Sequence, residues 1–176
     1  MAIITLAMTL VAFGVTLLSC ASDIRSMRIP NTYALVILAC FIPAWLATPA
    51  AFGPFLDHLE ALGIMFVVTY IMFAIGIMGG GDSKLATALG LWLGLKGLAP
   101  FIFYMALIGG LLGMATLLLQ KKKLFSNPKP GSWIEQAQAG QNAVPYGVAI
   151  SFGSWASFCH TALVHNHLNE VFNIIH

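Results

Sequence analysis

Long apolar runs alternate with short polar segments along almost the whole chain. Each run approaches the ~20 residues that an α-helix needs to cross a bilayer. The pattern predicts an all-α fold, a polytopic membrane bundle of about six transmembrane helices. We expect residues 1–176 to form a single transmembrane domain, with the first run retained because no clear signal-peptide cleavage site follows it. The apolar runs cover residues 2–21, 32–48, 61–78, 84–97, 98–119 and 144–164.

The stretch 85–119 is too long for one span and too short for two of full length. Lys96, Gly97 and Pro100 interrupt it. We therefore expect two spans, the first short or tilted, with the Lys96 ammonium reaching an interface. Two spans also keep the later lysines on the same side of the membrane as the earlier basic residues.

Two polar segments separate the other runs. Residues 49–60 read as a loop without Lys or Arg, and residues 120–143 read as a polar connection. Trp133–Gln136 within the second segment is a candidate short interfacial helix. His165 and His167 in the terminal tail are two positions apart, which is a poor geometry for metal ligands, so we expect no metal site and no cofactor.

Basic residues gather in alternate connections between the spans. The first, third and fifth connections hold every Lys and Arg except Lys96. Because cytoplasmic loops carry the excess of positive charge, these connections are expected in the cytoplasm and both termini outside. The residues concerned are Arg25, Arg28, Lys84, Lys121, Lys122, Lys123 and Lys129.

The composition agrees with a membrane protein. Hydrophobic residues make up 59% of the chain and charged residues only 8%, against about 25% in soluble domains. Mean hydropathy is +0.89. Cys20, Cys40 and Cys159 are far apart and form no CxxC pair, so a zinc ribbon or thioredoxin-like motif is excluded and the three read as small buried hydrophobes. The bilayer is the expected surrounding, and no nucleic-acid partner is expected.

One of only six acidic residues, Asp82, follows three glycines at the end of an apolar run. An ionisable residue at membrane depth is a functional-site hypothesis by default. Glycines allow another backbone to approach closely. Gly79, Gly80 and Gly81 are therefore candidates both for binding an extended substrate strand and for close helix packing. Lys84 reads as a cytoplasmic anchor, or as a charge acting on Asp82.

Asp23 is the best partner for Asp82, because it also follows an apolar run and lies on the same expected side. Two adjacent carboxyl groups share a proton, which suits peptide hydrolysis. One would take a proton from an attacking water while the other hydrogen-bonds to the scissile carbonyl. The alternative is structural: Asp23 pairs with Arg25 or Arg28, and Asp82 caps the following helix.

The segments around these aspartates resemble the two signature motifs of the prepilin peptidases, membrane aspartyl proteases of the Gly-x-Gly-Asp class. The residues concerned are Asp23 with Ile29-Pro30-Asn31, and Gly79-Gly80-Gly81-Asp82-Ser83-Lys84-Leu85. Val144–Ile150 is similar to a third family segment. The resemblance implies that Asp23 and Asp82 are catalytic. It also implies a substrate, a prepilin whose basic leader is cleaved at the cytoplasmic face of the bacterial inner membrane.

The chain departs from the larger bifunctional members of that family. Those members carry a cytoplasmic domain with a tetra-cysteine zinc site, which methylates the new pilin terminus. This sequence shows neither that soluble domain nor paired cysteines, so the expected activity is cleavage without methylation, as in the stand-alone peptidases of Flp (tight-adherence) pili. Two other functions stay open on the residues alone: a proton-coupled transporter, and a non-catalytic subunit of a pilus or secretion machine.

Overall fold

The computed structural model describes residues 1–160, and every element in that range is a helix. The expected end of the last apolar run at 161–164, and the histidine pair His165 and His167, lie outside the described residues. The helices are α1 Ala2–Ser26, α2 Asn31–Ala47, α3 Pro49–Phe52, α4 Phe55–Ala74, α5 Gly80–Lys121, α6 Trp133–Gln138 and α7 Tyr146–His160.

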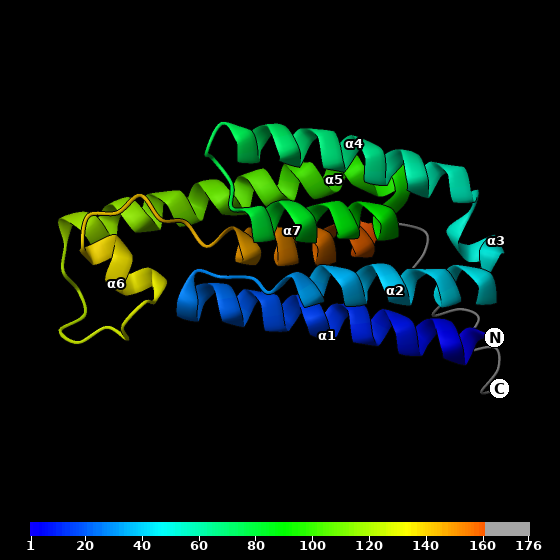
Figure 1. Ribbon diagram of the computed structural model, residues 1–176, viewed down its shortest axis with the longest axis horizontal. Helices are drawn as coiled ribbons and strands as arrows, with labels where there is room; N and C mark the ends of the chain where they lie inside the picture. Colours follow the sequence, from blue (N-terminus) through cyan, green and yellow to red (C-terminus); the bar gives the residue numbers. More distant parts are fainter. Residues whose placement is uncertain (161–176) are drawn as a thin grey trace.

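The long helices lie side by side along the longest axis of the molecule (Figure 1). Three of them, α1, α4 and α5, are long and apolar enough to cross a membrane, and α2 is a shorter apolar helix. Their outer faces expose large hydrophobic side chains such as Leu10, Leu35, Phe66 and Leu111. Exposed apolar surface on this scale fits contact with lipid, and the chain is an integral membrane protein.

Helix α5 is two helical arms joined by a reversal at Gly94. Gly94 has φ 60° and ψ −178°, a conformation open to glycine because it has no Cβ. Figure 1 shows the ribbon turning back on itself at this point. The sequence predicted a break between residues 97 and 98. The structure places the break earlier, at the glycine whose backbone makes the turn.

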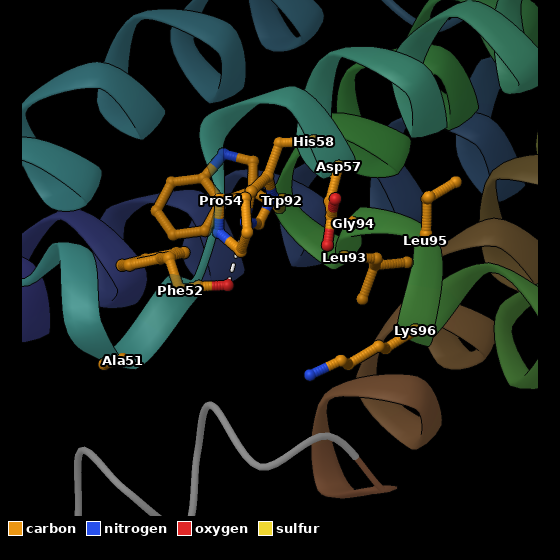
Figure 2. Close-up of a pocket in the computed structure, with 10 residues that line it drawn as sticks. All are labelled: Ala51, Phe52, Pro54, Asp57, His58, Trp92, Leu93, Gly94, Leu95 and Lys96. Carbon is orange, nitrogen blue, oxygen red and sulfur yellow. Dashed lines mark hydrogen bonds between the residues drawn. The ribbon is translucent and has the colours of Figure 1, made fainter.

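His58 of α4 packs against this reversal (Figure 2). Its Nδ1 lies 2.7 Å from the carbonyl oxygen of Leu91, and its Nε2 lies 3.1 Å from that of Phe52. The predicted loop at 49–60 is therefore wrong, since α3 and α4 occupy most of it. Prolines explain the difference: Pro49 opens α3 and Pro54 precedes α4, and proline suits the start of a helix.

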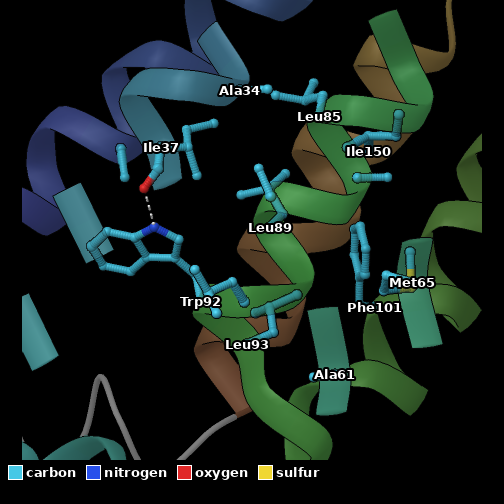
Figure 3. Packing of buried hydrophobic residues seen from close by; sticks show 14 of the residues in the cluster. Ala34, Ile37, Ala61, Met65, Leu85, Leu89, Trp92, Leu93, Phe101 and Ile150 are labelled. Atoms are coloured by element: carbon cyan, nitrogen blue, oxygen red, sulfur yellow. Dashed lines mark hydrogen bonds between the residues drawn. The ribbon is translucent and has the colours of Figure 1, made fainter. Parts of the chain in front are cut away.

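The first arm of α5, Gly80–Leu93, lies at the centre of the core (Figure 3). Leu85, Leu89 and Trp92 on this arm are almost fully buried. The indole N–H of Trp92 donates to the carbonyl oxygen of Ile37 in α2 at 2.7 Å. Most of the stretch after Lys84 is apolar and buried, which is typical of a helix inside a bundle and explains why this short arm is stable.

The connections between helices lie in two groups, one at each end of the bundle (Figure 1). The α1–α2 connection, the α4–α5 connection and the segment around α6 lie at one end. The N-terminus, α3 and the turn at Gly94 lie at the other. The basic residues other than Lys96 therefore belong to segments that gather at one end.

Candidate active site

Asp23 lies in the last turn of α1, which continues past the predicted apolar run to Ser26. Met27, in a left-handed conformation with φ 51°, ends the helix and donates its N–H to the Asp23 carbonyl oxygen. The Asp23 side chain is only 3% exposed. Its Oδ2 accepts the backbone N–H of Gly147, at the start of α7, at 2.7 Å. A buried carboxylate needs such a donor, and here a distant helix supplies it.

Asp82 lies in the first turn of α5. Gly76, with φ 75°, makes the turn after α4, and Gly79 is the N-cap of α5 with no side-chain cap bond. Asp82 is therefore the third residue inside the helix and not its N-cap. Its carboxyl group interacts with the backbone N–H of Gly79, so a helix-capping role stays compatible with a catalytic one. Its Oδ1 is buried and has no hydrogen-bond partner within the described residues. An unpaired buried carboxyl oxygen is costly and is typical of functional sites.

The two aspartates meet in one cavity of about 450 Å³. Both carboxyl groups lie within range of an electrostatic interaction with each other. The cavity lies where the end of α1 meets the beginning of α5. Its lining is completed by the α1–α2 connection and the glycine run: Met27, Arg28, Ile29, Pro30, Asn31, Gly79, Gly80 and Gly81.

At two of the three glycines, an added Cβ would come too close to a neighbouring atom. A Cβ at Gly81 would lie 2.8 Å from the carbonyl oxygen of Ile29, too close for the two backbones to pack as they do. A Cβ at Gly79 would lie 2.6 Å from Oδ2 of Asp82. Close packing thus explains Gly81, and room for the carboxylate explains Gly79. Both residues also line the cavity, so a substrate role is compatible with these contacts.

Lys84 does not line the aspartate cavity. Its Nζ is exposed and donates to Oδ1 of Asn31 at 3.0 Å. It borders a neighbouring, largely apolar groove of about 370 Å³ between α2, α4 and α5. Asn31 lines both hollows. The lysine therefore contacts the wall of the cavity rather than the carboxylates.

A cluster of buried hydroxyl groups supports the turn that carries Asp82. Ser83 donates to Thr69 of α4 at 3.0 Å, and Thr69 also lies 3.1 Å from the Thr87 hydroxyl. These bonds tie the first turn of α5 to α4. Sequence reasoning missed this cluster and the Gly147 contact, because each joins residues that are separated along the chain. One signal pointed to the segment that holds Gly147: the similarity of Val144–Ile150 to a third segment of the prepilin peptidases.

The geometry provides two neighbouring carboxyl groups, one held by an N–H donor and one with an unpaired oxygen, at an open hollow. Such a pair can bind a water molecule and move protons to and from it. Among residues 1–160, no serine or cysteine lines the cavity. The arrangement therefore suits hydrolysis by an activated water.

A family model described as the type IV leader peptidase family matches residues 10–114, which include both aspartates. The chain belongs to the type IV leader peptidase family. A leader peptidase of this family is a protease, and the buried Asp23 and the half-buried Asp82 lie within the matched region. Val144–Ile150, which carries Gly147, lies outside that region.

Two curated relatives agree with the family assignment. The chain is 35% identical over 99 residues to a prepilin leader peptidase/N-methyltransferase of Bacillus subtilis, covering 55% of this chain and 39% of that protein. It is 26% identical over 161 residues to a protein of the same name from Xanthomonas campestris, covering 83% of this chain and 49% of that protein. The leader peptidase chain thus matches half or less of each relative's length. No solved structure matches it.

Proposed function

We propose that this chain is a membrane-embedded aspartic endopeptidase that removes the leader peptide of Flp-like type IV prepilins. The observation that carries the proposal is the meeting of Asp23 and Asp82 in one cavity beside the glycine run. Family membership favours this function over a proton-coupled transporter or a non-catalytic assembly subunit, because the relatives are named as prepilin leader peptidases.

In the proposed reaction, one carboxylate takes a proton from a water molecule, and the water oxygen attacks the scissile carbonyl carbon. The other aspartate, protonated, donates to the carbonyl oxygen as it gains charge. When the tetrahedral intermediate collapses, the C–N bond breaks and the leaving amine takes a proton from the first aspartate. Gly79 and Gly80 are positioned to bind substrate backbone, since both line the cavity without side chains.

We place the site at the cytoplasmic face of the bacterial inner membrane. Six spans with both termini outside are our proposal: α1, α2, α4, the two arms of α5 counted separately, and α7 supply six helical segments. The basic segments gather at the end of the bundle that holds the aspartates, as the excess of positive charge in cytoplasmic loops requires (Figure 1). An exposed Lys96 near the opposite end fits an interfacial position.

We also propose that this chain cleaves without methylating. The three cysteines of the sequence are far apart, and a tetra-cysteine zinc site needs paired ones. The partners are then the prepilin with its basic leader and the surrounding lipid.

Cleavage by the purified protein in detergent tests the proposal. The full chain is mixed with a Flp-like prepilin, and the mature N-terminus is identified by mass. We expect cleavage by the wild type and a loss on the order of 10³-fold in kcat for Asp23→Asn and Asp82→Asn. Asp57→Asn, which carries the same change near the Gly94 turn, is the control. Near wild-type cleavage by either site variant contradicts the two-aspartate mechanism, and a methylated product contradicts the single activity.

A further inference from the structure

Gly147 donates its backbone N–H to Asp23 and to no carbonyl oxygen of its own helix within the described residues. It lies in the first turn of α7, where backbone N–H groups have no partner inside the helix. Its N–H donates to Oδ2 of Asp23 at 2.7 Å, within the range of a strong bond to a carboxylate. One oxygen of Asp23 is therefore fixed by α7, which leaves Oδ1 for chemistry in the cavity.

The missing side chain of Gly147 matters as much as its N–H. A Cβ at this position would lie 3.0 Å from both Cβ and Oδ2 of Asp23. It would also lie 2.8 Å from Cδ1 of Ile29. Asp23 is almost completely buried and has free space only on its cavity side, so a Cβ would push the carboxylate toward the cavity and away from the Gly147 N–H. Any side chain at residue 147 would displace the carboxylate.

A second contact holds this part of α7 against α1. The hydroxyl of Ser151, one turn after Gly147, lies 2.9 Å from the carbonyl oxygen of Thr16 in α1 and 2.7 Å from that of Gly147. Ser151 is fully buried. The first turn of α7 is thus fixed relative to α1, and the Gly147 N–H points at Asp23 from a rigid position.

We propose that Gly147 is a positioning residue for the peptidase reaction: its N–H fixes the Asp23 carboxylate, and its lack of a side chain leaves the carboxylate room. This inference rests on the proposed function. It extends the machinery beyond the two aspartate segments to the start of the last helix, outside the region that the family model matches.

Gly147→Ala is the first test, measured as kcat and KM for a Flp-like prepilin that the wild type cleaves. A Cβ 3.0 Å from the carboxylate would move it by a few tenths of an ångström. A displacement of about 1 Å at a catalytic group costs on the order of 100-fold in rate, so for this smaller shift we expect kcat to fall on the order of 10-fold. KM is expected to stay within about twofold, because substrate contacts are unchanged. Gly109→Ala is the control, since its Cβ would make only ordinary contacts, 3.7 Å or more from Tyr146 and Ala149.

A double variant distinguishes displacement of the Asp23 carboxylate from crowding of Ile29. Ile29→Val removes Cδ1, the atom that a Cβ at residue 147 would approach most closely. Gly147→Ala is therefore also made in the Ile29→Val background and compared with Ile29→Val alone. We expect the loss in kcat to persist. Recovery to the level of Ile29→Val would assign the effect to crowding of Ile29 and overturn the proposal.

The N–H is tested without adding any atom. Glycolic acid in place of Gly147, introduced during cell-free synthesis, replaces the amide by an ester and removes the donor. The helix loses no internal bond, so the protein is expected to fold, and kcat is expected to fall on the order of 10-fold. If Gly147→Ala does not fold, the ester variant alone tests whether the Gly147 N–H positions Asp23. A wild-type kcat in the ester variant overturns the proposal. If the wild type cleaves no prepilin, the proposed function fails instead.

Discussion

The hydroxyl of Ser83 donates to the hydroxyl of Thr69 at 3.0 Å, one residue after Asp82. Thr69 is fully buried in α4, and its hydroxyl also lies 2.8 Å from the carbonyl oxygen of Met65 in its own helix. The side chain therefore joins α4 to the turn that carries a proposed catalytic group. The site depends on a contact between helices that neither aspartate makes.

Thr69→Val is expected to lower both stability and kcat. Valine keeps the shape but leaves the buried Ser83 hydroxyl without its acceptor, which costs about 1–3 kcal/mol in free energy of unfolding. The first turn of α5 loses its tie to α4, so kcat is expected to fall while KM changes little. Thermal unfolding in detergent and cleavage kinetics provide the two measurements.

Thr9→Val is the matched control for this change. The Thr9 hydroxyl donates only to the Thr5 carbonyl oxygen within its own helix, 2.8 Å away. Its loss is expected to leave kcat at the wild-type level. Equal kcat in Thr69→Val and Thr9→Val would show that the hydroxyl cluster does not position Asp82.

Neighbouring glycines are expected to differ in their tolerance of alanine. At Gly81 a Cβ would lie 2.8 Å from the Ile29 carbonyl oxygen, which is backbone and cannot move cheaply. At Gly80 the nearest atom is 3.3 Å away, on the exposed ring of Phe73, which can rotate. Gly81→Ala should therefore abolish cleavage, whereas Gly80→Ala should retain most of it. The reverse order would mean that substrate, and not packing, determines the need for glycine.

Lys84→Met is expected to leave kcat within about threefold of the wild-type value. The Lys84 ammonium is exposed and bonds Asn31 instead of an aspartate, and exposed polar contacts contribute little. Lys121→Met, far along α5, is the control for a change in surface charge. A loss of about 100-fold in Lys84→Met alone would place the ammonium in the reaction, as the charge hypothesis from the sequence holds.

His58→Phe is expected to destabilise the protein without impairing the chemistry. Phenylalanine keeps the ring that packs on Phe41, 4.9 Å away between centroids, but removes the contact with the Leu91 carbonyl oxygen. The free energy of unfolding should fall by about 1–3 kcal/mol. The reversal at Gly94 lies at the other end of the bundle from the aspartates, so kcat of the folded protein should be unchanged. Glu60→Gln, an exposed neighbour, is the control.

Hydropathy was sufficient to predict the helical membrane fold and a break within 85–119, because lipid demands long apolar helices. The exact turn at Gly94 was not predictable, since Lys96, Gly97 and Pro100 are stronger local signals. The loop predicted at 49–60 failed for a related reason: polar residues such as His58 enter α4 because their partners come from other helices.

The residues of the candidate site also fall into those that the sequence predicted and those that it did not. Asp23 and Asp82 were found as costly charges at the ends of apolar runs. Asn31 as the partner of Lys84, Thr69 behind Asp82 and Gly147 beside Asp23 were missed. Each of these three contacts exists only after distant helices pack. The similarity of Val144–Ile150 to a family segment marked the region of Gly147 but not its contact with Asp23.

The shortness of the first arm of α5 bears on how the protein fits the membrane. Its 14 residues, Gly80–Leu93, extend about 21 Å at 1.5 Å per residue, well below the ~30 Å thickness of the hydrocarbon layer. Beyond its end lies a small hollow of about 60 Å³ that includes Asp57, His58 and Lys96 in its lining. Leu85, Leu89 and Trp92 are almost fully buried, so neighbouring helices and not lipid surround this arm, and its shortness imposes no thinning on the bilayer.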